Sequence, residues 1–223
     1  MGLVYRDAAR ATGNLYFAGG LDPGLLASLM HPDKAKWDRI YTERQSAAPQ
    51  PAEVLLQNRH LLPQQGIALD LACGLGANSL LLAEQGLEVH AWDISSVAIE
   101  QLDDQAQQRQ CLIHAQVRDV KSAPPEALSL DVLVVTHFLV RDMAADLLAA
   151  LKPGGLLFYQ TYCRDKVFEQ GPGNPDYLLK DNELLQLFAG LKVRVYREES
   201  LLGDHNQGWR NQSMLVAEKP SLF

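Results

Sequence analysis

The stretch ALDLACGLGANSLLLAEQGLEVHAWD, residues 68–93, decides the fold. An apolar run ends in Asp70, and Gly74 and Gly76 follow before an apolar-periodic segment begins. A second apolar run then ends in Asp93. A strand, a glycine turn, a helix and a second strand in this order are the unit from which parallel sheets are built. The stretch therefore predicts one such unit with a glycine-rich turn at its centre.

The rest of the chain continues this alternation, because β-rich apolar runs alternate with segments of helical periodicity. The expected strands cover residues 67–72, 87–92, 112–117, 131–138 and 156–162, and two closing segments, 192–200 and 210–219. The expected helices cover residues 35–45, 52–61, 77–85, 95–109, 141–151 and 181–189. This order predicts an α/β fold, with a doubly wound, seven-stranded, mostly parallel sheet. The connection between the closing segments is too short for a crossover helix, which predicts an antiparallel C-terminal hairpin.

Composition narrows the class of protein. The chain has 223 residues, is 47% hydrophobic and carries a formal net charge of −7, which disfavours binding to phosphate backbones. The three cysteines suit a reducing compartment, and the six histidines are scattered, so we expect a cytoplasmic protein without a metal site. No apolar run approaches the roughly 18 residues of a membrane span. We expect no membrane partner, and a monomer or weak homodimer.

The first 29 residues are set apart from the single domain expected over residues 30–223. The sequence NLYF at 14–17 resembles part of an engineered protease-site linker, although Ala18 does not fit such a site. A native arm and an over-extended start site are the alternatives. We expect this segment to be a tag-like or disordered extension and base no site on it.

The glycine turn faces the crevice of a doubly wound sheet, where such folds bind ligands. Gly74 and Gly76 let the backbone approach a ligand, because they have no Cβ. The next helix begins there and offers unpaired N–H groups. Asp93 follows about 20 residues on, where an acid that binds ribose hydroxyls is expected. The turn and the acid therefore predict a site for an adenosine-like ligand.

Two cofactors contain adenosine and differ in charge. A nicotinamide dinucleotide usually needs G-x-G-x-x-G, whereas this chain has Ser79 in place of the third glycine. The carboxylate of Asp70 would repel a pyrophosphate, yet could organise the turn near a cationic amino-acid ligand. This combination favours S-adenosylmethionine, which has a sulfonium, an ammonium and a carboxylate but no phosphate.

The sequence resembles the class I S-adenosylmethionine-dependent methyltransferases over roughly residues 35–219. The motifs that carry the likeness are LDLACGLGANS, VHAWDIS, VRDV, DVLVVTHFLV and LKPGGLLFYQTY. In this resemblance, Asp93 is the ribose acid and Asp119 meets the adenine amino group. Ala72 stands where a glycine is commoner.

Within that family, GANSLLLAEQGLEVHAWDIS is most similar to the tellurite-resistance and thiopurine methyltransferase-like branch. The resemblance implies a small, soft nucleophile as the methyl acceptor, such as a thiol or a metalloid oxyanion like tellurite or selenite. Some relatives in the tellurite group carry a His-Arg pair late in the chain. Here His205 is followed by Asn206, and Arg210 lies further on.

The candidate site residues fall into two groups. The expected cofactor-binding residues are Trp37, Tyr41, Arg44, Asp70, Ala72, Cys73, Gly74, Gly76, Asn78, Asp93, Ile94, Asp119, Val120 and Thr136. The expected catalytic residues are His137, Tyr162, His205 and Arg210. Methyl transfer needs mainly alignment, and a base only for a protonated nucleophile, so no catalytic triad is expected.

Several of these residues also have a purely structural interpretation. Trp37, Tyr41 and Arg44 share one helix face, which either packs into the core or covers the methyl donor, with Arg44 pairing its carboxylate. His137 is either a core histidine or a site residue, and Cys73 is better explained as a small packed thiol. His205 and Arg210 either line a substrate pocket or belong to a surface loop.

Three functions compete. The leading one is a methyltransferase for a small molecule. An NAD(P)-dependent oxidoreductase is the second, and the missing third glycine counts against it. A catalytically silent methyltransferase-fold protein that binds a cofactor or partner is the third.

Overall fold

The computed structural model describes residues 31–43 and 49–221. The expected N-terminal extension lies outside these residues, and so do Arg44 and the end of the expected first helix. In the described part of the chain, the strands form one seven-stranded sheet in the order β3-β2-β1-β4-β5-β7-β6. The strands are β1 (Ile67–Leu71), β2 (Glu88–Asp93), β3 (Ile113–Val117), β4 (Leu130–Thr136), β5 (Leu151–Tyr162), β6 (Lys192–Arg197) and β7 (Gln212–Glu218).

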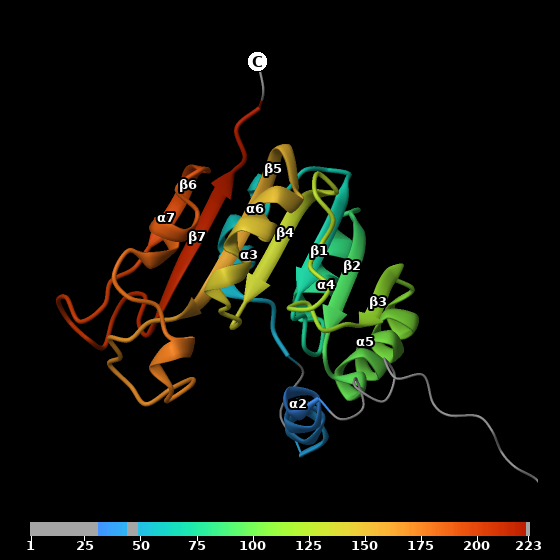
Figure 1. Ribbon diagram of the computed structural model, residues 1–223, viewed down its shortest axis with the longest axis horizontal. Coiled ribbons are helices and arrows are strands. Elements are labelled where there is room, and N and C mark those ends of the chain that lie inside the picture. Colours follow the sequence, from blue (N-terminus) through green and yellow to red (C-terminus); the bar gives the residue numbers. More distant parts are fainter. Residues whose placement is uncertain (1–30, 44–48, 222–223) are drawn as a thin grey trace, which may run out of the picture.

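The predicted α/β fold is confirmed. Strands β1 to β5 pair in parallel, and β7 pairs antiparallel with both β5 and β6 (Figure 1). The closing hairpin therefore inserts β7 between β5 and the edge strand β6. The strand order reverses between β1 and β4, so the crevice predicted from the sequence opens at the carboxyl ends of these two strands.

Helices cover both faces of the sheet. They are α2 (Pro32–Glu43), α3 (Glu53–Asn58), α4 (Ala77–Glu84), α5 (Ser96–Arg109), α6 (Ala144–Ala150) and α7 (Glu183–Leu187), with short 3-10 turns η1 (Arg59–Leu61), η2 (Arg141–Met143) and η3 (Pro175–Tyr177). Figure 1 shows α6 and α7 in front of the sheet, α3 and α4 behind it, and α2 below the carboxyl ends of the parallel strands.

Alternation along each strand produces two cores. Leu69, Leu133 and Leu157 pack in the core that also holds side chains of α6 and α7. Their neighbours Ala68 and Val132 face the other core, which holds side chains of α3 and α4. Successive strand residues point to opposite faces, so an apolar residue at every position requires a layer of structure on each side. The continuous apolar run at 131–138 predicted this arrangement.

Several boundaries differ from expectation, most of all in the second half of the chain. The helix expected over 141–151 begins as the turn η2 and ends at Ala150, because Leu151 already pairs with Leu130 in the sheet. Strand β5 therefore starts before its expected first residue, 156. The helix expected over 181–189 is limited to Glu183–Leu187. Ser95 caps α5, because its hydroxyl accepts a hydrogen bond from the Ala98 N–H at 3.2 Å.

Gly76 offers a direct test of the turn. It adopts φ +76°, and a Cβ there would lie 2.2 Å from the Cδ1 of buried Leu102. Gly76→Ala should therefore lower the free energy of unfolding by about 2–5 kcal/mol, through left-handed strain and overpacking. Urea denaturation measures this. Gly190→Ala is the matched control, since no atom lies within 4 Å of its added Cβ. Equal stability of the two variants would contradict the tight turn.

Candidate active site

A cavity of about 630 Å³ opens at the carboxyl ends of the parallel strands. Its wall is built from the ends of β1, β2, β4 and β5, from α2, and from the segment around Gly171 and Tyr177. Of the expected site residues, the wall contains Trp37, Tyr41, Ala72, Cys73, Gly74, Gly76, Asn78, Asp93, Ile94, Asp119, Val120, Thr136, His137 and Tyr162. The fold thus gathers these expected residues from six separate segments around one space.

Asp93 joins the glycine turn to the end of β2. Its Oδ2 accepts a hydrogen bond from the Gly74 N–H at 2.8 Å, and its Oδ1 accepts one from the Ser95 N–H at 2.9 Å. The side chain is largely buried, and this burial raises the pKa of its carboxyl. Each carboxylate oxygen has capacity for a second hydrogen bond, and Asp93 lines the cavity. The carboxylate therefore fits a ligand that presents hydroxyl donors, such as a ribose.

Gly74 lies where α2 meets the turn. It has φ +54°, and a Cβ built on it would stand 2.8 Å from the hydroxyl oxygen of Tyr41. Tyr41 stacks on Trp37, with ring centroids 5.8 Å apart. A side chain at Gly74 would therefore strain the turn and displace the helix that covers it.

Asp70 was expected to contact the cofactor, but it does not line the cavity. The residue is fully buried beneath the turn, where its Oδ2 accepts a hydrogen bond from the Ser79 hydroxyl at 2.7 Å. Ser79 thus takes the place of the third glycine and ties the first turn of α4 to β1. Burial raises the pKa of Asp70 to about 7. Asp70 thus organises the turn from below, as the sequence suggested, but without lining the cavity.

Two residues of the wall carry backbone strain. Ala72 follows β1 with φ 56°, and His137 follows β4 with φ 54°. A residue with a Cβ in this left-handed region is disfavoured by about 1 kcal/mol or more. Strained backbone of this kind concentrates at functional sites, where the surrounding structure enforces it. Position 72 is the one at which the resembled family more often has glycine.

The β3–β4 connection forms one side of the cavity. Asp119 lines it and accepts a hydrogen bond from the Lys121 N–H at 3.0 Å. Arg118 places its guanidinium 3.7 Å from the centroid of the Trp92 ring and donates to the Ala123 carbonyl. Both Arg118 and Lys121 line the cavity, but sequence reasoning missed them. For Arg118 a signal existed, because it sits next to Asp119 in the quoted VRDV motif.

Other cavity residues were also not anticipated. They are Asp33, Lys36, Ile40, Pro49, Gln50, Ala52, Leu75, Ala77, Phe138, Leu139, Val140, Thr161, Gly171, Pro172 and Tyr177. Most of them are neighbours of expected residues on the same element. Tyr177 has no such signal, because its position depends on how the long segment after β5 folds back. Arg44 lies outside the described residues, so its pairing with the cofactor carboxylate stays a prediction.

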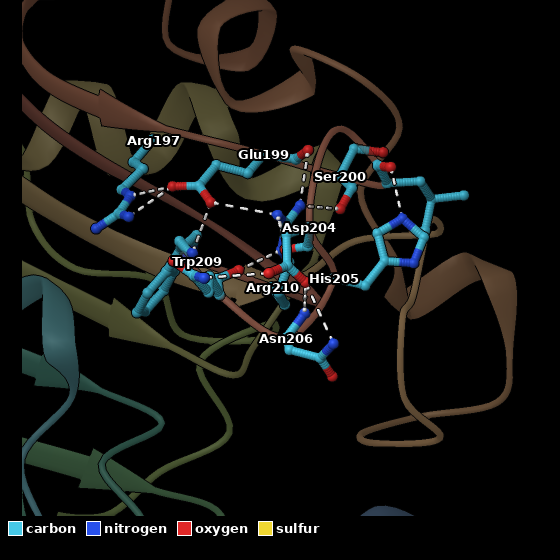
Figure 2. A network of polar contacts seen from close by, with 10 residues as sticks. Arg197, Glu199, Ser200, Asp204, His205, Asn206, Trp209 and Arg210 are labelled. Atoms are coloured by element: carbon cyan, nitrogen blue, oxygen red, sulfur yellow. Dashed lines mark hydrogen bonds and ion pairs between the residues drawn. The ribbon is translucent and has the colours of Figure 1, made fainter.

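His205 and Arg210 do not line the cavity. Figure 2 shows them in a network within the β6–β7 loop. The Arg210 guanidinium donates to the carbonyls of Ser200, Asp204 and Gln207, and His205 Nε2 lies 2.7 Å from the Leu201 carbonyl. Arg210 therefore holds its own loop together. This placement supports the interpretation of His205 and Arg210 as surface-loop residues.

Neither a metal centre nor a thiolate nucleophile is built into the described site. Within residues 31–43 and 49–221, no group of three or more His, Cys, Asp or Glu side chains is placed to hold a metal ion. Burial raises the pKa of the Cys73 thiol well above its usual range. No helix in the described part of the chain is both long and apolar enough to cross a membrane.

Comparison with known proteins gives a consistent result. Residues 68–155 match the family described as Methyltransferase domain. The ubiquinone biosynthesis O-methyltransferase of Coxiella burnetii is 30% identical over 118 residues, which are 51% of this chain and 47% of that protein. The malonyl-[acyl-carrier protein] O-methyltransferase of Salmonella typhimurium is 31% identical over 107 residues, 45% and 41% of the two chains. The chain therefore spans about half the length of the curated relatives it matches.

Solved structures share the fold. TehB from Haemophilus influenzae superimposes with a TM-score of 0.61 at 21% identity, covering 82% of this chain and 67% of that one. Geranyl diphosphate C-methyltransferase from Streptomyces coelicolor, in complex with S-adenosyl-L-homocysteine, gives 0.64 at 13% identity, covering 85% and 98%. Residues 68–155 are thus similar to a methyltransferase domain. The described residues share the Rossmann-like fold of solved methyltransferases, one of which holds the product form of the cofactor S-adenosylmethionine. The residues present fit that cofactor, because the glycines Gly74 and Gly76 and the buried carboxylate of Asp93 face the same cavity.

The buried Asp70 makes stability depend on pH. Because its pKa is about 7 in the folded chain and near 3.9 in an unfolded one, the folded state binds the proton more tightly. Stability from this group is thus lost as pH rises, by about 2–3 kcal/mol between pH 5 and pH 7. Asp70→Asn keeps the acceptor for Ser79 but does not titrate. Urea denaturation at both pH values should show a smaller loss in the variant, and an identical pH dependence would contradict the assignment.

Proposed function

We propose that the chain transfers a methyl group from S-adenosylmethionine to a small-molecule acceptor. The observation that carries this proposal is the Asp93 carboxylate, which lines the cavity while it holds the N–H of Gly74. A second acid, Asp119, lines the same cavity. Lys36, Arg118 and Lys121 line the cavity as well, so its charge suits a nucleoside of either kind. What disfavours the NAD(P)-dependent alternative is Ser79 in place of the third glycine, together with the methyltransferase relatives.

The protein itself forms no covalent bond in this reaction. S-adenosylmethionine supplies an activated methyl carbon on a positively charged sulfur. The acceptor's nucleophilic atom forms a bond to that carbon as the carbon–sulfur bond breaks, and the bonding pair returns to sulfur. A proton on the acceptor leaves to a base or to water. The cavity walls contribute by aligning the acceptor and excluding water.

His137 and Tyr162 are the candidates for positioning or deprotonating the acceptor. Both line the cavity, and their ring centroids lie 5.2 Å apart. His137 extends from the carboxyl end of β4 and Tyr162 from that of β5, next to each other in the sheet. An imidazole there can accept a proton from a thiol or hydroxyl near neutral pH.

The proposed chemical class of the methyl acceptor rests only on the branch of methyltransferases that the sequence resembles. The likeness of residues 76–95 to the tellurite-resistance and thiopurine methyltransferase-like proteins supports a thiol or a metalloid oxyanion. The Haemophilus influenzae structure supports the fold, at an identity too low to transfer an acceptor. We therefore propose the soft-nucleophile class for a first panel of thiols, selenite and tellurite with radiolabelled donor. A blank across that panel would retire this class.

Removing the ribose acid tests cofactor binding. Asp93→Ala should weaken binding of S-adenosylhomocysteine about 10- to 150-fold, because hydrogen bonds to a charged group contribute about 1.5–3 kcal/mol. Calorimetry measures this, with the exposed Asp104→Ala as the matched control. Because Asp93 also holds the turn, Asp93→Ala could disturb the fold. Asp93→Asn, which keeps the size of the side chain, therefore serves as a second variant. The unmodified chain should bind S-adenosylmethionine and S-adenosylhomocysteine but not NADPH, and tight NADPH binding would refute the proposal.

Replacing the imidazole tests the catalytic group. His137→Gln should lower kcat by about 100-fold for an acceptor that must lose a proton, because glutamine cannot take up that proton. The loss of rate should persist at neutral pH. Affinity for S-adenosylhomocysteine should stay the same. The assay is radiolabel transfer to the thiol that the panel identifies, followed across pH. His60→Gln, on the turn η1 away from the cavity, is the control, and equal rates for both variants would exclude His137.

A further inference from the structure

Helix α2 is attached to the rest of the molecule by a partly buried polar network at the start of α5. Asp38 Oδ1 accepts a hydrogen bond from the Ser95 hydroxyl at 2.6 Å, and its Oδ2 accepts one from Lys34 Nζ at 2.5 Å. Lys34 Nζ also donates to the Ser96 hydroxyl at 2.9 Å. Lys34 and Ser95 are both buried. Because a buried charge is stable only when it is paired, this network specifies one docked position for the helix.

Ser95 belongs to this network and to the cofactor site at once. Its N–H donates to Asp93 Oδ1 at 2.9 Å, while its hydroxyl donates to Asp38. Asp93 holds the glycine turn through the Gly74 N–H. A continuous series of hydrogen bonds therefore runs from the turn, through Asp93 and Ser95, to Asp38 on α2. Charge-assisted bonds of this kind are among the stronger ones in proteins.

The far side of α2 is part of the cavity. Trp37, Ile40 and Tyr41 of α2 all line the cavity. The helix thus presents its aromatic residues to the ligand and its Asp38 to Ser95. Burial by itself raises the pKa of Asp38, but the hydrogen bonds from Lys34 and Ser95 outweigh it and hold that pKa below its usual value. Asp38 is therefore held as a carboxylate, the form that accepts both bonds.

We propose that Asp38 and Ser95 form a latch that couples occupancy of the Asp93 site to the docking of α2. This inference rests on the proposed function, because it takes S-adenosylmethionine as the ligand at Asp93. A ligand that orders Asp93 favours the docked helix, and the docked helix retains the ligand, since coupling between two sites is reciprocal. Asp38 and Ser95 act as positioning residues, and the quantity they control is the residence time of the cofactor.

The latch predicts a kinetic signature with S-adenosylhomocysteine as the probe. Asp38→Ala should accelerate its dissociation about 10-fold or more, the equivalent of one charge-assisted hydrogen bond. The association rate should stay within twofold of the unmodified chain. Stopped-flow tryptophan fluorescence measures both rates, and Asp104→Ala on the exposed face of α5 is the matched control. A dissociation rate unchanged in Asp38→Ala would overturn the latch.

A double-mutant cycle separates coupling from general destabilisation, since Ser95→Ala also removes the cap of α5. In the combined variant, dissociation should be no faster than in the faster of the two single variants. Multiplication of the two single effects would contradict a shared interaction. Hydrogen exchange in α2 should slow when the probe binds the unmodified chain, and not in Asp38→Ala. Absence of probe binding to the unmodified chain would instead overturn the proposed function, and the latch with it.

Discussion

The carboxylate of Asp93 is the interaction on which the site depends. It accepts the N–H of Gly74 from the turn after β1 and the N–H of Ser95 from the start of α5. The turn after β1 and the β2–α5 connection, which are separate in sequence, are thereby held around one pair of oxygen atoms. Because the pair is almost fully buried, losing either N–H donor would leave a poorly solvated charge, which is costly. The acid thus both shapes the cavity and faces it.

The turn that this acid holds carries a cost in stability. Ala72 takes a left-handed conformation without being glycine, and Asp70 is buried beneath the turn with a raised pKa. Neither feature improves the packing of the sheet. Both lie in the cradle that brings backbone atoms close to a ligand, which is where proteins accept strain in exchange for function. The close contact between Gly74 and Tyr41 extends this constraint to α2.

The sequence predicted the sheet well, and it predicted that the glycine turn and its acid face one crevice, because both are encoded locally. Alternating apolar runs set the strands, and the spacing of Gly74, Gly76 and Asp93 marked the turn and its acid. The bond between Ser79 and Asp70 was not predicted, since a missing glycine does not reveal what the replacing hydroxyl contacts. The placement of Tyr177 was not predicted either, because it depends on a long segment without periodicity.

The residues whose placement differs from expectation also depend on loop structure or on contacts between distant segments. His205 and Arg210 were selected by likeness to a motif whose spacing this chain does not keep, and the loop uses both residues to bind its own carbonyls (Figure 2). The role of Asp38 escaped notice because its partners lie 57 or more residues away, except for Lys34. Contacts that bridge distant segments leave no periodic pattern in a single sequence.

A crystal structure of the chain with S-adenosylhomocysteine would show whether Asp93 binds the ligand. We expect the ribose hydroxyls within hydrogen-bond distance of the Asp93 carboxylate, with the nucleoside lying over Gly74 and beneath α2. A ligand bound elsewhere, or a cavity closed by side chains at Asp93 under saturating ligand, would contradict this expectation.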